Sequence, residues 1–170
     1  MSDIVVYGDP VLIKKAAKVD SFGEDLKELV HEMHKSMIKA QGIGLAAPQI
    51  GVSQQVAIVD TSVGEDPEAL SVLINPEIIA AFGTQKGEEG CLSFPGIVTV
   101  IERPHYVKLR GLDLDGNPTE LEGTGLVARA FCHEIDHLNG VLILDRVSPL
   151  KKNMIKKKVQ KRVKAGTWAS

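Results

Sequence analysis

The chain has 170 residues, of which 44% are hydrophobic and 25% charged, and its net charge is −2. These values are typical of a soluble globular domain and exclude a disordered or fibrous chain. No apolar stretch approaches the length of a membrane span and residues 1–10 lack a secretory-signal pattern, so we expect a cytoplasmic protein without membrane contact. The two cysteines, Cys91 and Cys132, are too few for a disulfide framework, so we expect no disulfide-linked partner.

The first predicted helix begins after Ser21. Ser21 and Glu24 have the spacing of a capping box, and apolar residues then recur at helical spacing as far as residue 38. We expect Gly42 to end the helix, because glycine adopts the left-handed conformation without a Cβ penalty. His31 and His34 lie on this helix among lysines and glutamates, so we expect both to be exposed.

Short runs rich in β-branched residues follow and predict strands. These strands are residues 55–60, 72–74, 78–82, 97–101 and 106–109. Turn-forming residues at 115–118 separate residues 109–114 from 119–121, which predicts a hairpin.

Two more helices are predicted near the C-terminus. Thr124 can cap a helix over residues 125–138 that ends at Asn139-Gly140. Ser148 and Pro149 begin another helix at about 149–165. We expect its apolar stripe, Leu150, Met154, Ile155, Val159 and Val163, to pack on the rest of the chain. This order predicts an α+β fold in a single domain, residues 1–170, with mostly antiparallel sheets around the central helix and an N-terminal and a C-terminal helix.

The predicted central helix carries a metal-binding pattern. His133 and His137 are four residues apart and therefore lie on one helix face, where they can share a metal ion. Glu134 is adjacent to the first histidine and can accept a proton from water at the metal, which predicts a general base. The alternative is a charged, half-exposed helix that matches a short pattern by chance.

The third ligand is not part of this helix. A downstream histidine at the usual spacing is missing, because Ile143 occupies its position, and no glutamate follows Glu134. The ligand is therefore upstream, or an aspartate such as Asp145. Cys91 is the best upstream candidate because a thiolate binds zinc or ferrous iron well, although a small buried hydrophobe is the alternative interpretation. Cys132 points roughly 100° away from His133 on the helix, so we expect it in the core.

Three segments together resemble the signature motifs of the peptide deformylase family: residues 42–49, 89–93 and 133–137. The resemblance implies that Cys91, His133 and His137 bind the metal and that Glu134 transfers protons. It further implies that the Gln49 side chain and the Leu92 backbone N–H face the reacting carbonyl, and that Ile43, Gly44 and Gly90 line the peptide channel.

The pocket for the first substrate side chain, expected to be methionine, is predicted from the helix face that carries His133. Leu126 and Ala130 precede His133 by seven and three residues, and Arg129 by four. Leu126 and Ala130 are predicted to form walls of this pocket. Arg129 is predicted either to edge it or to be an exposed helix residue.

The resemblance implies an enzyme that removes the N-terminal formyl group from N-formyl-Met nascent peptides and releases formate. It implies one divalent metal ion per chain, Fe²⁺ in the cell, although Zn²⁺, Ni²⁺ or Co²⁺ also suits thiolate and imidazole ligands. The alternatives are a zinc endopeptidase, disfavoured by the missing downstream ligand, and a non-catalytic ribosome- or RNA-binding domain with a structural metal. Glu134 argues against the latter, because a closed structural site does not need a base.

The C-terminal helix is strongly basic. Residues 149–170 carry eight Lys or Arg and no acid, which leaves −10 on the rest of the chain. Positive charges without acids among them attract phosphates, and the resemblance implies that this helix helps to dock the protein near the ribosomal exit tunnel. We predict weak ribosome association through Lys151, Lys152, Lys156, Lys157, Lys161 and Lys164. The alternative is that these lysines form an ordinary solvated surface.

Charged residues near the metal motif are expected to support it. Glu89 directly precedes the segment with Cys91, and Asp136 lies within the helix motif. We predict that one of these two carboxylates pairs with Arg103 and helps to hold the metal ligands in place.

Overall fold

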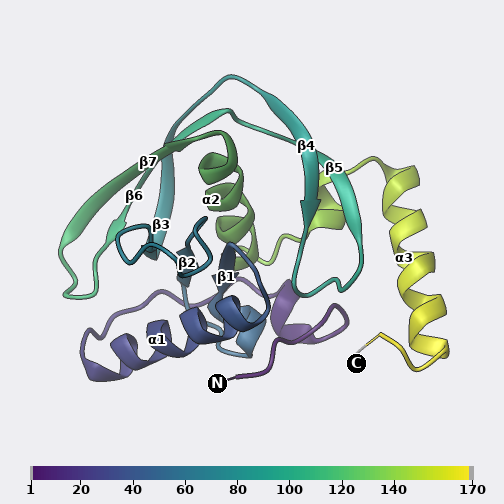
Figure 1. The fold of residues 1–170 in the computed structure, drawn as a ribbon, viewed down its shortest axis with the longest axis horizontal. Helices are drawn as coiled ribbons and strands as arrows, with labels where there is room; N and C mark the ends of the chain where they lie inside the picture. Colours follow the sequence, from purple (N-terminus) through teal and green to yellow (C-terminus); the bar gives the residue numbers. More distant parts are fainter. Residues whose placement is uncertain (1, 169–170) are drawn as a thin grey trace.

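The computed structural model describes residues 2–168 and contains two antiparallel sheets around a central helix (Figure 1). The larger sheet has the order β1-β2-β3-β6-β7, and its strands are Gly44–Ala46, Val56–Val59, Ser71–Phe82, Tyr106–Leu112 and Pro118–Thr124. The smaller sheet pairs β4, Gln85–Gly90, with β5, Val98–Arg103. The helices are α1, Glu24–Lys39, α2, Gly125–Leu138, and α3, Pro149–Lys164. Short 3₁₀ helices are η1, Pro10–Ile13, η2, Ala47–Ile50, and η3, Ile143–Arg146. The α+β prediction is confirmed.

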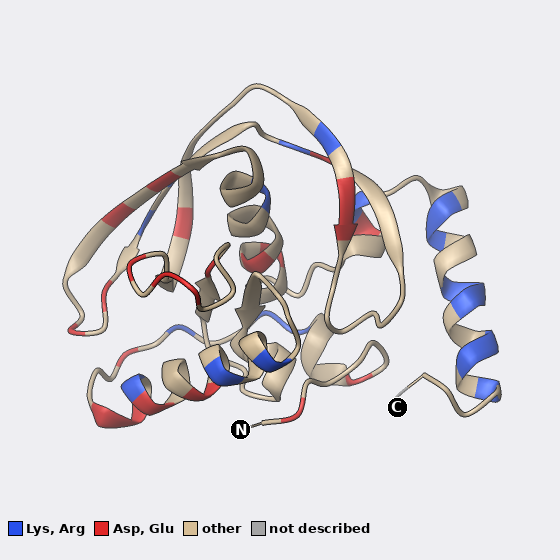
Figure 2. Ribbon diagram, viewed as in Figure 1, with Lys and Arg blue, Asp and Glu red and all other residues tan. Residues whose placement is uncertain are grey.

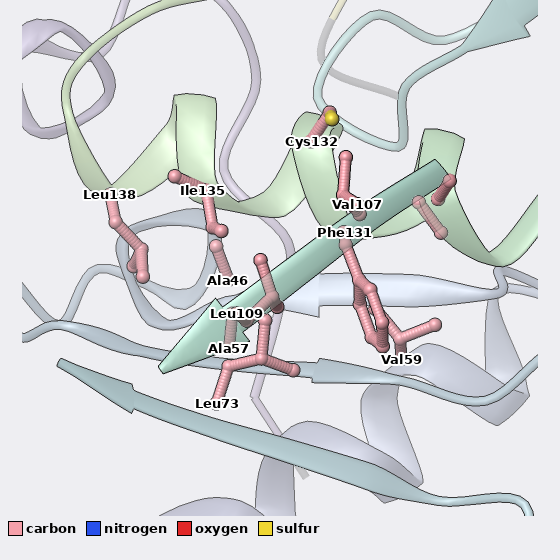
Figure 3. Packing of buried hydrophobic residues seen from close by; sticks show 12 residues of the cluster. Ala46, Ala57, Val59, Leu73, Val107, Leu109, Phe131, Cys132, Ile135 and Leu138 are labelled. Carbon is pink, nitrogen blue, oxygen red and sulfur yellow. The ribbon is translucent and has the colours of Figure 1, made fainter. Parts of the chain in front are cut away.

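Helix α2 packs directly on the five-stranded sheet. Phe131, Ile135 and Leu138 are buried against strand residues such as Ala57 and Leu109 (Figure 3). Burying each large apolar side chain contributes about 1.5–3 kcal/mol, so this face holds the helix firmly. Every residue from Ala128 to Leu138 is buried, which places the histidine motif inside the protein.

Helix α1 covers residues of the same sheet that point away from α2. Strand β2 is buried on both faces, with Ala57 and Val59 toward α2 and Val56 and Ile58 toward α1, because side chains alternate along a strand. Met33 of α1 is fully buried in this second cluster. Strand β2 is therefore fixed by packing on both of its faces.

The predicted capping residues of α1 are wrong, although the helix itself, Glu24–Lys39, agrees with the prediction. The N-cap is Gly23, with no side-chain cap, so Ser21 does not form the capping box. At the other end Gln41 adopts the left-handed conformation, with φ 56°, rather than Gly42. The buried apolar face of α1, not its capping residues, determines where this helix lies.

The two histidines of α1 differ from each other. His31 is exposed, as predicted. His34 is partly buried, and its Nε2 lies 3.0 Å from Oδ2 of the fully buried Asp60, so the prediction for His34 is wrong.

The strands differ from the sequence prediction in three places. Residues 72–74 and 78–82 form the single strand β3, which tolerates Pro76 through register shifts on either side of Glu77 and Ile78. Strands β1 and β4 are not predicted, because β1 has three residues and β4 is largely polar. The hairpin between β6 and β7 is confirmed, with Gly116 at φ 81° in its turn.

Helix α3 begins as predicted, with Ser148 Oγ accepting from Lys151 N at 3.3 Å and Pro149 in the first turn. Its predicted apolar stripe is wrong in part. Ile155 and Val159 are buried, whereas the other three residues are 55–72% exposed. Those three are Leu150, Met154 and Val163. The helix lies at the edge of the molecule (Figure 1), and Ile155 and Val159 are its buried residues. Among the described residues no helix is long and apolar enough to cross a membrane.

Candidate metal centre

Three potential metal ligands converge between α2 and the end of β4. The distance from Cys91 Sγ to His137 Nε2 is 3.3 Å, and that from His137 Nε2 to His133 Nε2 is 3.2 Å. The three ligand atoms all lie within 4.8 Å of one another. In a tetrahedral site, two nitrogen ligands that each lie about 2.0–2.1 Å from the metal are roughly 3.3 Å from each other. The distance between the two histidine nitrogens therefore fits one shared ion. Residues 133–137 and Cys91, far apart in the sequence, therefore form a Cys-His-His group that can bind a metal.

Glu134 lies beside this group and is almost completely buried. Its Oε1 is 3.9 Å from His133 Nε2, and its Oε2 has no hydrogen-bond partner among residues 2–168. Burial raises the pKa of the Glu134 carboxyl to about 7. A buried carboxylate without a partner is costly, and a nearby cation would offset that cost. The donor set and this unpaired oxygen both fit a bound cation.

The two histidines differ in their protonation. Burial lowers the pKa of His137 well below its usual value, and the neighbouring His133 lowers it further. Burial opposes the charge of His133 too, but hydrogen bonds with Cys91 and Glu89 raise its pKa well above the usual value. The pKa values of the two buried histidines therefore shift in opposite directions, because hydrogen-bond partners outweigh burial at His133 alone.

Glu89 orients His133 from behind. Its Oε1 lies 2.7 Å from His133 Nδ1, so this nitrogen donates and Nε2 is left for the ligand group, 3.2 Å from His137 Nε2. Glu89 also accepts from Arg103 Nε and Nη2 at 3.0 and 2.8 Å, and from Arg129 Nη1 at 2.7 Å. Burial would raise the pKa of Glu89, but the hydrogen bonds from His133 and Arg103 lower it to about 2. Glu89 is therefore a carboxylate at every physiological pH.

Asp136 extends this network to the molecular surface. It accepts from Arg103 Nη1 at 2.7 Å and from Arg146 Nε and Nη2 at 3.0 and 2.7 Å. The prediction that Glu89 or Asp136 pairs with Arg103 is confirmed, since both do. Arg146 was not predicted, because its position ten residues after Asp136 depends on how η3 returns to α2.

Gln49 and Leu92 both lie beside Cys91. Gln49 is 1% exposed; its Oε1 accepts from Ala46 N at 3.0 Å, and its Nε2 donates to Ser93 Oγ at 3.2 Å and lies 3.7 Å from Cys91 Sγ. Within residues 2–168 no group accepts a hydrogen bond from the Leu92 N–H. Ser93, fully buried and not predicted, thus helps to orient the Gln49 amide. Its position in segment 89–93, which resembles a family signature motif, is a sequence signal that could have indicated it.

A cavity of about 480 Å³ is lined by Glu134 and by two of the candidate ligands, Cys91 and His133. All the residues predicted for the channel and pocket line it: Ile43, Gly44, Gly90, Leu126, Arg129 and Ala130. A Cβ on Gly44 would lie 2.8 Å from Glu134 Oε1, so glycine is needed where β1 approaches the carboxylate. Arg129 is not an exposed helix residue: it is 7% exposed, and its Nη1 donates to Glu89 and to the carbonyls of Gly87 and Ile101.

Cys132 is 6% exposed and packs in the core, as predicted. Burial raises the pKa of its thiol, which keeps it neutral. It is absent from the Cys-His-His group formed by the described residues.

A buried Cys-His-His group with a glutamate beside it, open to a large cavity, defines a metal-dependent hydrolase. The polypeptide deformylase family model matches residues 1–153. A relative from Acidobacterium capsulatum, named peptide deformylase, is 48% identical over 165 residues and covers 97% of each chain. One from Thermodesulfovibrio yellowstonii with the same name is 49% identical over 156 residues, 92% of this chain and 94% of the relative.

Solved structures agree with these relatives. The peptide deformylase of Legionella pneumophila has a TM-score of 0.88 and 40% identity, and the alignment covers 97% of this chain and 98% of that one. That of Thermotoga maritima has a TM-score of 0.81 and 47% identity, with 88% and 99% covered. The chain therefore belongs to the polypeptide deformylase family. It is a hydrolase that removes the N-terminal formyl group of newly made polypeptides, and the endopeptidase and non-catalytic alternatives are not favoured.

Proposed function

We propose that Cys91, His133 and His137 bind the catalytic metal ion and that Glu134 transfers the protons of the deformylation reaction. The observation that carries this proposal is the convergence of three ligand atoms within 4.8 Å beside a buried, unpaired carboxylate oxygen. When bound, a divalent cation polarises the formyl carbonyl and lowers the pKa of water to about 7. Fe²⁺ is the proposed ion in the cell, since thiolate and imidazole suit it; Zn²⁺, Ni²⁺ and Co²⁺ also fit this donor set.

The protein groups around the ion have separate roles. Glu134 accepts a proton from the attacking water and then delivers it to the amine nitrogen, because an amide nitrogen does not leave as an anion. The Gln49 Nε2 and the Leu92 N–H donate to the formyl oxygen as negative charge develops there. Gln49 is held in advance by Ala46 and Ser93, so its donation requires little reorganisation.

The substrate is proposed to lie in the 480 Å³ cavity, with its formyl end at Glu134. Ile43, Gly44 and Gly90 would line the channel for the peptide backbone. Leu126 and Ala130 would contact the methionine side chain, since both line the same cavity from α2. Arg129 would edge this pocket with its stem, because its guanidinium is bound to Glu89.

Helix α3 is proposed to associate weakly with the ribosome. Lys151, Lys157, Lys161 and Lys164 are exposed along it, and Figure 2 shows basic residues over its whole length. Lys156 is partly exposed, whereas Lys152 Nζ is 3.0 Å from Asp145 Oδ1, which reduces its availability to a phosphate. A cytoplasmic location, where nascent formylated chains emerge, and a single catalytic domain over residues 1–170 complete the proposal.

The proposed function is tested by formate release from formyl-Met peptides. The purified protein should release formate, lose activity on chelation, and regain it when Fe²⁺ is added anaerobically. Metal content per chain should rise in parallel with activity. Formate release that persists after complete metal removal would contradict the proposal.

A further inference from the structure

Part of the cavity wall is the segment of residues 94–97, which follows Cys91. Phe94 N donates to Cys91 O at 2.9 Å and Ile97 N donates to Phe94 O at 3.1 Å, so the segment is a compact turn. Gly96 adopts φ 72° within it. The wall segment therefore follows a candidate metal ligand closely in the chain. Its conformation depends on the contacts that support the turn.

The C-terminal segment packs against this wall. Trp168 is 5% exposed, and its ring meets that of Phe94 edge-on, with centroids 6.2 Å apart. The Trp168 Nε1 donates to Tyr7 O at 2.8 Å, and the Tyr7 ring stacks on Phe94 with centroids 4.9 Å apart. Tyr7 N also donates to Ser93 O at 2.8 Å. Phe94 is thus held between residues from opposite ends of the chain.

Arg162 of α3 contacts both the C-terminal segment and the wall segment 94–97. Its Nη1 donates to the carbonyl of Pro95, and a Cβ on Gly96 would lie 3.3 Å from this nitrogen. Its Cζ lies 5.2 Å from the centre of the Trp168 ring, a cation–π contact. Its Nη2 donates to Thr167 O at 3.1 Å. One guanidinium therefore connects α3, the C-terminal segment and the cavity wall.

We infer that Arg162 and Trp168 are positioning residues that hold the wall segment 94–97 in the form that binds substrate. Neither residue lines the cavity or contacts a candidate metal ligand. Their loss therefore weakens the binding of the peptide and leaves the chemical step largely unchanged, which is read as a higher KM at constant kcat. The inference rests on the proposed use of this cavity as the peptide channel.

The test compares Arg162→Met with Lys158→Met, which removes the same charge from an exposed position one turn earlier on α3. Arg162→Met should raise KM for formyl-Met peptides about threefold to tenfold, the scale of one polar contact, with kcat within twofold and metal content unchanged. Amide hydrogen exchange at Ile97 should become about tenfold faster. Lys158→Met should match the wild type in all four measurements.

A second variant, Trp168→Phe, keeps an aromatic ring beside Phe94 but removes the donor to Tyr7 O. It should show the same KM increase and faster exchange, and it decides the question if Arg162→Met does not fold. Unchanged KM in the variant that folds would overturn the inference, as would a loss of kcat together with metal. Wild-type formate release that is insensitive to chelation would instead contradict the proposed function, so the two failures are distinguishable.

Discussion

Cys91 is the proposed ligand that distinguishes this centre from one built on histidines alone. Its thiolate is a soft donor, and a neutral hydroxyl replaces it poorly. We predict that Cys91→Ser lowers the affinity for Zn²⁺ or Co²⁺ at least about tenfold and lowers formate release with it. Competition with a chromogenic chelator measures this affinity. A variant with wild-type affinity and activity would show that a different residue is the third ligand.

Glu89 links the protonation of the centre to the stability of the fold. Its pKa is lowered from 4.5 to about 2 in the folded protein, so it stabilises the fold above pH 4.5, and this contribution disappears as the pH falls toward 2. The shift corresponds to about 3 kcal/mol at pH 7. We predict that Glu89→Gln lowers the free energy of unfolding by an amount of this order at pH 7, and by less than half of it near pH 3.

Urea unfolding of the metal-free wild type and Glu89→Gln at both pH values measures this difference. A difference that is constant between pH 7 and pH 3 would show that Glu89 does not act through its charge.

At the residue scale, short-range patterns were predictable and long-range partners were not. The spacing of His133 and His137 places them on one helix face, and the packing of Cys132 in the core follows from its direction on that helix. The contacts of Arg146 with Asp136 and of Ser93 with Gln49 could not be predicted, because they depend on how distant segments meet.

Helix α3 is the element whose charge is least balanced by its surroundings. Its exposed lysines are proposed to contact phosphates, and each phosphate contact adds about one unit to the slope of log affinity against log salt. We predict that reversing Lys157, Lys161 and Lys164 to Glu reduces ribosome co-sedimentation at low salt, while turnover of short formyl-Met peptides is retained. Ribosome pelleting over a salt series measures the first effect, and formate release the second.

The matched control reverses three exposed lysines near the other end of the chain, Lys14, Lys15 and Lys18. This control has the same net charge and should pellet like the wild type. Equal loss in both triple variants would show that net charge, not α3, governs the association.

Among the elements, the positions of α2, α3 and the β6–β7 hairpin were predictable from local signals. Thr124 takes the N-cap position of α2, although its side chain forms no cap hydrogen bond, Ser148 caps α3, and turn residues connect the hairpin. Strands β1 and β4 were not predictable, because they have little apolar alternation and owe their conformation to pairing with β2 and β5. The exposure of part of the apolar stripe of α3 was also not predicted, since residue spacing alone does not show which of these side chains contact the rest of the chain.

At the scale of the whole molecule, the fold buries α2 and leaves one side of this helix facing the cavity. The sheet holds Phe131 and Ile135, and the other side of the same helix presents His133 and Glu134. The order of helices and strands was enough to predict the α+β class. It was also enough to predict antiparallel sheets around the central helix, but which strands pair in each sheet was not predictable, because pairing depends on contacts between distant segments.

The central claim is that Glu134 transfers protons and does not bind the metal. The most direct test is metal content and formate release measured on the same preparation of Glu134→Ala. The claim predicts that the variant keeps one metal ion per chain while kcat falls by at least about 10²-fold, the usual contribution of a general base. Loss of the metal from this variant, or turnover near the wild-type rate with the metal retained, would contradict the claim.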